Sequence, residues 1–200
     1  LSQNLANFPD SLSLATLGMI ADVIPLTGFN RSIAYHGLKQ LNQTKHPGIK
    51  SLIQASGLLN QIDSGQVAFQ LAPRLNASGR IDDASKSFQL LISKDLNTAL
   101  LLANELNNLN SQRQILTIKA LEFVDTQIDG LPLIIANHSS FDEGIIGLVA
   151  ARLLEKYYRP AVVLSVGDDI SKASVRSHSH INIIEFLTSA SKHFLTLGGH

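Results

Sequence analysis

The segment from Leu131 to Val166 decides the fold, and it reads LPLIIANHSSFDEGIIGLVAARLLEKYYRPAVVLSV. The apolar run Leu131–Ala136 at its start predicts a buried strand. The next part, Glu143–Tyr158, is rich in Ile, Val, Leu and Ala, and this composition predicts a helix. A second apolar run, Ala161–Val166, predicts another buried strand.

The residues after Val166 extend this strand–helix–strand unit. Gly167–Asp169 predicts a turn, and Ala173–Arg176 predicts a third strand that forms a hairpin with the second. Asn182 or Ile183 is expected to begin a closing helix that ends near Phe194. The resulting order, β-α-β-β-α, predicts a small α/β domain.

The sequence before this segment predicts helices. Pro and Gly are both absent from 93–129, and the apolar spacing predicts one helix from Leu96 to about Gln127. At ~1.5 Å per residue such a helix is ~45 Å long. The run Leu12–Ile20 fits either a helix or a buried strand. Shorter helices are expected at 30–41, 47–57, 64–70 and 82–92.

The composition excludes several classes of protein. With 44% hydrophobic and 16% charged residues among 200, the chain is not an intrinsically disordered tail. Sixteen basic and sixteen acidic residues cancel, so that any anion site must be a local cluster. Cysteine is absent, which excludes disulfides, zinc–thiolate sites and thiol catalysis, and a cytoplasmic location is expected. No apolar run approaches the ~20 residues of a membrane span.

Asp22 is the first candidate functional residue, because it lies alone in the apolar stretch GMIADVIP. A buried carboxylate must be hydrogen-bonded, paired or bound to a metal ion, since stranding its charge is costly. The sequence fits a helix cap or turn carboxylate, and it also fits a metal ligand.

The segment Pro73–Arg80, PRLNASGR, is the second candidate. Arg74 and Arg80, with Asn76 between them, predict a compact loop rich in hydrogen-bond donors that suits phosphate oxygens. The alternative is that the two arginines pair with nearby carboxylates such as Asp82, and the sequence does not decide between them.

The segment KASVRSHSH, residues 172–180, concentrates hydroxyl, guanidinium and imidazole groups. In a strand, Ser174 and Arg176 share one face, and this pair suits a terminal phosphate. An exposed polar strand edge is the alternative. His178 and His180 have the spacing to bind a metal ion from one face, but no third ligand lies at a telling distance in the sequence.

Four stretches, taken together and in order, resemble one known family. They are Gly18–Leu26 with Asn30, Arg31, Gly37 and Leu38; Pro73–Arg80; Leu109, Asn110, Arg113 and Gln114; and Gly144–Gly147 with Arg152, Leu153, Tyr157–Pro160, Ser174–Ser177 and Gly198–His200. On these residues the chain resembles the RecJ family of single-strand-specific 5′→3′ DNA exonucleases, in the DHH phosphoesterase superfamily.

The resemblance implies an α/β architecture with three parts. Residues 1–45 would be the C-terminal end of a DHH catalytic domain, and residues 46–130 a helical region with a long connecting helix. Residues 131–200 would be a DHHA1 domain, truncated at its C-terminus. In such enzymes single-stranded DNA, the expected partner, lies between the two domains, and the activity serves DNA repair and recombination. No membrane association is expected.

The resemblance also implies roles for individual residues. Asp22 matches a catalytic aspartate that helps to hold a pair of Mn²⁺ or Mg²⁺ ions, which activate water for phosphodiester hydrolysis. The residues that match DNA-binding positions, including those at the 5′ end of the strand, are Arg74, Asn76, Arg80, Ser174, Arg176, Gly198, Gly199 and His200. Base stacking requires exposed rings, for which Phe141, Tyr157 and Tyr158 are candidates.

The chain departs from the family pattern in several places. The Asp-His-His signature is absent, so that these 200 residues alone are predicted to be an inactive part of an exonuclease. Phe141 and Asp142 stand where tryptophan and histidine are usual, and Ala173 replaces a glycine. Two alternatives stay open: a DHH-family phosphoesterase that acts on short oligonucleotides, and a non-catalytic scaffold or nucleic-acid-binding module.

Overall fold

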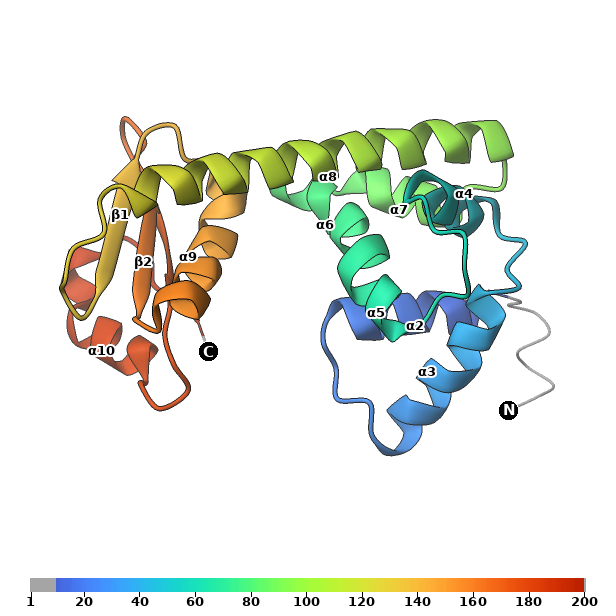
Figure 1. Ribbon diagram of the computed structural model, residues 1–200, viewed down its shortest axis with the longest axis horizontal. Helices are drawn as coiled ribbons and strands as arrows, with labels where there is room; N and C mark the ends of the chain where they lie inside the picture. The colour runs from blue at the N-terminus through green and yellow to red at the C-terminus, as the bar shows by residue number, and fades with distance from the viewer. Residues whose placement is uncertain (1–9, 200) are drawn as a thin grey trace. The chain divides into compact units, whose positions relative to one another are not determined.

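The computed structural model describes residues 10–199 and divides the chain into two compact units, 1–112 and 113–200. The division falls inside one continuous helix, α8 (Leu96–Asp125), which Figure 1 shows without a break. The predicted long helix and the mixed helix–sheet architecture are therefore confirmed. The domain boundaries at residues 45 and 130 stay predictions.

All regular secondary structure in the described residues of the first unit is helical. Its elements before α8 are α2 (Ser11–Ala21), α3 (Gly28–Leu41), α4 (Pro47–Ala55), α5 (Ser64–Gln66), a π-helical turn (Val67–Leu71), α6 (Ala72–Ile81) and α7 (Ser85–Ile92). The residues at its centre are fully buried and come from α3, α4, the π-helical turn and α8: Leu41, Ile49, Leu52, Leu71 and Leu106. One hydrophobic core therefore joins the helices on both sides of residue 45.

The α2–α3 hairpin resolves the ambiguity of the Leu12–Ile20 run in favour of a helix. The two helices approach so closely that a Cβ atom on Gly37 would lie 1.9 Å from the Thr16 Oγ1 atom. Thr16 Oγ1 donates a hydrogen bond to the carbonyl of Ile33 across the same contact, at 3.2 Å. A small residue at this position is thus a condition for the hairpin.

The interpretation of Pro73–Arg80 as a loop was wrong, because these residues lie in α6. Pro73 does not end the helical region but occupies the first turn of α6, where a missing N–H group costs nothing. The π-helical turn Val67–Leu71 leads directly into it. Consequently, Arg74, Asn76 and Arg80 are presented on a helix.

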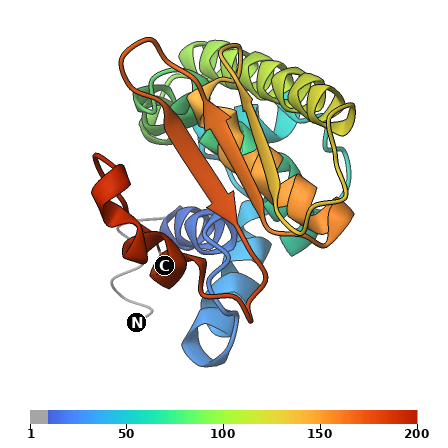
Figure 2. The same cartoon turned by 90° about the vertical axis from the view of Figure 1, so that its left-hand side faces the viewer.

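The second unit contains a three-stranded sheet in the order β1-β2-β3. Strand β1 (Ile134–His138) is parallel to β2 (Ala161–Ser165), and β3 (Lys172–Arg176) is antiparallel to β2. Figure 2 shows the three strands side by side, with α9 (Glu143–Tyr157) against one face. The chain ends with α10 (Ile183–Ser189) and a short 3-10 turn (Ser191–His193).

Strand β1 begins three residues later than the sequence predicts. Arg159 explains the shift, since its Nη1 atom donates hydrogen bonds to the carbonyl oxygens of Asp129, at 2.7 Å, and Leu131, at 2.5 Å. These contacts hold the entering segment as a turn. The first strand is therefore Ile134–His138 rather than Leu131–Ala136.

The core of the second unit lies between α9, the sheet and the C-terminal part of α8. Val149 and Leu153 of α9 and Val163 of β2 are fully buried, and Ala120 and Val124 of α8 pack into the same cluster. The predicted β-α-β-β-α order is confirmed. No helix within residues 10–199 combines the length and apolar character that crossing a membrane requires.

Candidate nucleic-acid interface

Asp22 follows the last residue of α2, and its side chain is exposed. The helix ends there in a Schellman motif: the N–H of Val23 donates to the carbonyl of Ile20, at 3.2 Å, and the N–H of Ile24 donates to that of Met19, at 3.0 Å. Val23 adopts a left-handed conformation (φ 54°), which is rare for a β-branched residue. The Asp22 carboxylate thus lies on a sharply turned, exposed helix end.

The described residues do not form a complete metal centre around Asp22. Within 10–199, no group of three or more His, Asp or Glu side chains is arranged to hold a metal ion. One carboxylate does not fit a pair of divalent ions, which require several oxygen ligands each. The predicted role of Asp22 as a metal ligand therefore requires further ligands that residues 10–199 do not supply.

On α6, Arg74 faces into the protein. Its Nε atom donates to Asn107 Oδ1 of α8, at 3.0 Å, and its Nη1 atom donates to the carbonyl of Gln70, at 2.7 Å. Partial burial lowers the pKa of the guanidinium from its usual value. Arg74 therefore ties α6 to α8.

Asn76 and Arg80 lie on a different face of α6 from Arg74. They are four residues apart, which places both on one side of the helix, and both are exposed. Among the carboxylates near α6, Asp82 pairs with Lys86 at 2.6 Å, and this hydrogen bond lowers the pKa of Asp82. The DNA-binding role of Asn76 and Arg80 stays a prediction.

On β3, Ser174 and Arg176 come together at one point of the surface of α9. A Cβ atom built on Gly147 of α9 would lie 3.2 Å from Ser174 Oγ and 3.6 Å from Arg176 Nη2. Both polar atoms thus border the space above Gly147, and Ser174 Oγ is the closer of the two. We call this arrangement of Gly147, Ser174 and Arg176 the β3 notch.

The surroundings of the β3 notch help to fix it. Ser174 pairs with Val163 in the centre of the β2–β3 ladder, and Arg176 Nη1 donates to the carbonyl of Val175, at 3.0 Å. At the other end of β3, Lys172 forms an ion pair with Glu143 in the first turn of α9. The notch therefore combines a hydroxyl and a guanidinium on a short edge strand that pairs with β2 and is joined to α9 at Lys172.

The unusual Asp142 has a structural role. It is the N-cap of α9, and its Oδ1 atom accepts a hydrogen bond from the N–H of Gly144, at 2.8 Å. The departure from the family pattern at this position therefore supplies a helix cap.

The structure shows few contacts at the C-terminal glycines, for which a nucleic-acid-binding role is predicted. Gly199 lies near α10, where a Cβ atom would be 3.5 Å from Ile184 Cδ1, and Gly198 has open space around it. His200 lies outside the described residues. The binding role of these three residues stays a prediction.

Of the three aromatic residues considered for base stacking, only Tyr158 presents its ring to solvent. Phe141 is 5% exposed and lies in the core. Tyr157 packs against the same core and donates its hydroxyl to Asp125 Oδ1, at 2.7 Å. Tyr158 is 81% exposed, and its ring stacks on that of His178, with 6.2 Å between ring centroids.

His178 and His180 do not have the geometry of a shared metal site. Their rings are stacked, with centroids 5.3 Å apart and planes within 5° of parallel. Imidazole lone pairs lie in the ring plane, so that those of two parallel stacked rings do not converge on one ion. The metal-binding alternative for these two histidines therefore lacks support from the structure.

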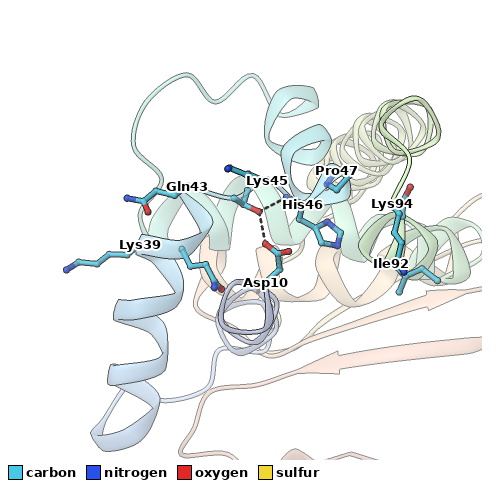
Figure 3. A pocket seen from close by; sticks show the side chains of 11 residues that line it. Asp10, Lys39, Gln43, Lys45, His46, Pro47, Ile92 and Lys94 are labelled. Atoms are coloured by element: carbon cyan, nitrogen blue, oxygen red, sulfur yellow. Dashed lines mark hydrogen bonds between the residues drawn. The ribbon is translucent and has the colours of Figure 1, made fainter. Parts of the chain in front are cut away.

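A cavity of about 770 Å³ in the first unit is separate from the predicted site residues. It lies beside the start of α2 and the beginning of α4, where Thr44 Oγ1 donates to Asp10 Oδ1, at 3.2 Å, and accepts from the N–H of His46, at 3.1 Å (Figure 3). Figure 3 shows the Lys39 side chain pointing away from Asp10 and His46, and its ammonium lies 4.3 Å from the centre of the Tyr35 ring.

Sequence reasoning missed two features of the second unit. In the sequence, Gly147 is one glycine in an apolar helix that belongs to a family motif. Nothing in this pattern indicates that Ser174 and Arg176 face it. The stacking of Tyr158 with His178 was likewise hidden, since twenty residues separate them in sequence. Only the pairing of β2 with β3 brings these residues together.

The chain is similar in sequence to several RecJ proteins. No family model matches the chain. The single-stranded-DNA-specific exonuclease RecJ of Bacillus subtilis is 40% identical over 205 residues, which cover 98% of this chain and 26% of that protein. The RecJ proteins of Thermus thermophilus and Escherichia coli are 36% and 32% identical, over 94% and 98% of this chain and 27% and 37% of their own lengths.

Solved structures give the same result. The crystal structure of RecJ in complex with Mg²⁺ from Thermus thermophilus matches 96% of this chain and 30% of its own with a TM-score of 0.88 and 35% identity. A RecJ exonuclease bound to manganese matches with a TM-score of 0.83, also at 35% identity, over 96% of this chain and 49% of its own. The chain spans about a quarter to just over a third of the length of the curated relatives that it matches, and it belongs to the RecJ family.

Proposed function

We propose that this chain is the DNA-binding part of a single-stranded-DNA-specific exonuclease, in which the β3 notch binds the 5′-terminal phosphate of the strand. The observation that carries the proposal is the convergence of Ser174 Oγ and Arg176 Nη2 on the space above Gly147. The names of the RecJ relatives support the substrate class.

The chemistry of the β3 notch suits a phosphate monoester. A guanidinium presents a planar set of donors that matches two phosphate oxygens, and a hydroxyl adds a third donor. A terminal phosphate carries up to two negative charges, whereas a 5′-hydroxyl carries none. The notch therefore distinguishes the two kinds of strand end.

A chain without net charge is compatible with this mode of binding. The affinity comes from a few local contacts with phosphate rather than from a basic surface, and each such contact releases about one counterion. We therefore expect a weak dependence of binding on salt concentration.

We further propose that the whole exonuclease hydrolyses phosphodiester bonds with two Mn²⁺ or Mg²⁺ ions, with Asp22 among the ligands, and that this chain alone is inactive. The support is the family membership, the metal ions named with the two related structures, and the incomplete ligand set among residues 10–199. An assay of this chain with single-stranded DNA and Mn²⁺ is expected to give no mononucleotides. Their release would contradict the proposed inactivity.

The same proposal includes the domain boundaries and the cellular role. Residues 1–45 would be the end of the DHH domain, 46–130 the connecting helical region and 131–200 the DHHA1 domain. The whole protein would act in DNA repair and recombination in the cytoplasm.

Fluorescence anisotropy with matched oligonucleotides tests the notch. The chain is expected to bind a 5′-phosphorylated oligonucleotide roughly tenfold more tightly than its 5′-hydroxyl counterpart, as charge-assisted hydrogen bonds allow. Arg176→Ala should abolish this preference, and Ser174→Ala should reduce it. Arg152→Ala removes an exposed arginine of α9 that pairs with Glu155, and this control should leave the preference intact. Equal affinity for both strand ends would overturn the assignment.

A further inference from the structure

Three rings on the surface of the second unit form a continuous stack. The ring of Tyr158 lies on that of His178, with 6.2 Å between centroids and 13° between planes. The ring of His178 lies in turn on that of His180, with 5.3 Å between centroids and 5° between planes. We call these three residues the ring ladder.

The backbone holds the ring ladder in place. A turn carries both histidines, closed by a hydrogen bond from the N–H of Ile181 to the carbonyl of His178, at 2.9 Å. The Ser177 hydroxyl donates to the carbonyl of Ile181, at 3.0 Å. The turn follows β3 directly, and Arg176 at the end of β3 pairs with Ala161 at the start of β2. Tyr158, three residues before Ala161, is thereby brought beside the turn.

Tyr158 adopts an unfavourable backbone conformation without gaining burial. It follows α9 with φ 52° and ψ 36°, in the left-handed region that normally takes glycine. This conformation costs a tyrosine free energy, yet the side chain stays 81% exposed. Strained residues of this kind cluster where a side chain is held for binding. Core packing does not account for the position of this ring.

The position of the ring ladder suits a strand held at the β3 notch. His178 is two residues beyond Arg176 in the sequence, and the ladder and the notch belong to the same unit. Every nucleobase has a π-face, so that a flat exposed ring binds any unpaired base by stacking. One tyrosine and two histidines thus place three near-parallel rings in the same unit as the candidate phosphate site.

We propose that the ring ladder is a stacking platform for an unpaired nucleobase of single-stranded nucleic acid. The choice of ligand class rests on the proposed function, whereas the platform itself rests on the ring geometry. The β3 notch contacts phosphate, and the ring ladder contacts a base.

The test separates base contacts from phosphate contacts. Two 5′-phosphorylated ligands of equal length are compared by fluorescence anisotropy with the full chain: an oligothymidylate, and an abasic deoxyribose–phosphate chain. The unmodified protein is expected to bind the oligothymidylate roughly 5- to 100-fold more tightly, as one stacked base allows.

The variants remove rings without disturbing the backbone. Tyr158→Asn deletes the ring, while asparagine tolerates the left-handed conformation. Together with His178→Ala, it should lower the affinity for oligothymidylate to that for the abasic chain and leave abasic binding unchanged. Tyr158→Phe keeps the ring and should retain full affinity. Tyr35→Ala removes a tyrosine of the first unit that is 56% exposed, and it serves as the matched control.

The outcomes distinguish the two proposals. If Tyr158→Asn and His178→Ala bind oligothymidylate as tightly as the unmodified protein, the ring ladder proposal is overturned, whatever Arg176→Ala does. If these variants lose the base-dependent affinity while Arg176→Ala has no effect, the ring ladder stands and the phosphate assignment fails. Failure of the chain to bind either ligand would overturn both.

Discussion

Two arginines, one in each unit, are used in opposite ways. In the helical unit, Arg74 donates to Asn107 and to the backbone of Gln70, and it therefore serves the fold. In the α/β unit, Arg176 lies at the end of an edge strand, with Nη2 beside the space left by Gly147. An arginine in a polar motif is therefore a candidate for phosphate binding only when its guanidinium remains accessible to a ligand.

The two units also use glycine differently. Gly37 permits two helices to touch, whereas Gly147 leaves room for two polar side chains. A substitution at Gly37 should therefore affect folding, and one at Gly147 should affect binding.

The largest effect is expected at Gly37. Gly37→Ala places a Cβ atom 1.9 Å from Thr16 Oγ1 and 2.5 Å from the carbonyl of Leu12, so that the α2–α3 hairpin must open. We expect a loss of about 3 kcal/mol in the free energy of unfolding, measured by urea denaturation. Gly18→Ala, in α2 with open space around it, is the control and should be neutral or stabilising by up to about 1 kcal/mol. Equal effects of both substitutions would refute the close helix contact.

The next largest effect is a difference between two substitutions, Arg74→Ala and Arg176→Ala, in how much they lower the stability of the protein. Arg74→Ala leaves Asn107 and a carbonyl without their donor, and we expect a loss of about 1–2 kcal/mol. Arg176→Ala, on the exposed edge strand, should change the stability by less than about 0.5 kcal/mol. Thermal unfolding of both variants measures this difference. Equal falls in the two melting temperatures would contradict the structural role of Arg74.

Gly147→Ala should affect binding more than stability. The added methyl group would lie 3.2 Å from Ser174 Oγ, which must shift slightly, and it would contact Arg176 Nη2 at 3.6 Å. We expect the preference for a 5′-phosphate to fall several-fold, while the better helix propensity of alanine keeps the protein folded. An unaltered preference, measured by anisotropy, would show that the notch does not hold the phosphate.

A smaller gain in stability is expected at the strained residues of both units. Val23→Gly and Tyr158→Gly each place glycine at a left-handed position, φ 54° and φ 52° respectively. Relief of strain should stabilise each by up to about 1 kcal/mol, partly offset by the greater freedom of glycine in the unfolded chain. Chemical denaturation of the two variants measures this gain. A marked loss of stability in either variant would contradict the strain argument.

The smallest effect is a pH dependence in the α/β unit. Hydrogen bonds from Lys156 and Tyr157 hold the pKa of Asp125 below its ordinary value of about 3.9. The stabilisation is therefore present above this value and is lost as the pH falls through the lowered pKa of the folded state. Asp125→Asn should be less stable than the unmodified chain at pH 7, and the difference should shrink as the pH falls below the ordinary pKa of about 3.9 and through the lowered pKa of the folded state. If the melting temperatures of Asp125→Asn and the unmodified chain differ by the same amount at pH 7 and at acid pH, ionisation of Asp125 does not stabilise the fold.

The fold was largely predictable because its signals are local. The uninterrupted helical pattern of α8 and the apolar runs of β2 and α9 identify these elements directly. The start of β1 was not predictable, since it depends on Arg159, about thirty residues away in the sequence. The helical state of Pro73–Arg80 was missed because proline usually ends a helix but is also tolerated in its first turn.

The candidate site was predictable only in part. The period of two along a strand places Ser174 and Arg176 on one face, as the sequence indicated. The role of Gly147 and the stacking of Tyr158 on His178 depend on how α9 and the β2–β3 hairpin pack, and no local pattern encodes this packing. The engagement of Arg74 by Asn107 likewise depends on the contact of α6 with α8.

The most direct test of the central claim is an NMR titration of the ¹⁵N-labelled chain with two oligonucleotides that differ only at the 5′ end. With the 5′-phosphorylated strand, the amide signals of Gly147, Ser174 and Arg176 should shift at the lowest ligand concentrations, and the 5′-hydroxyl strand should move them much less. Identical shifts of these three signals with both strands, or shifts confined to other residues, would contradict the assignment of the β3 notch to the terminal phosphate.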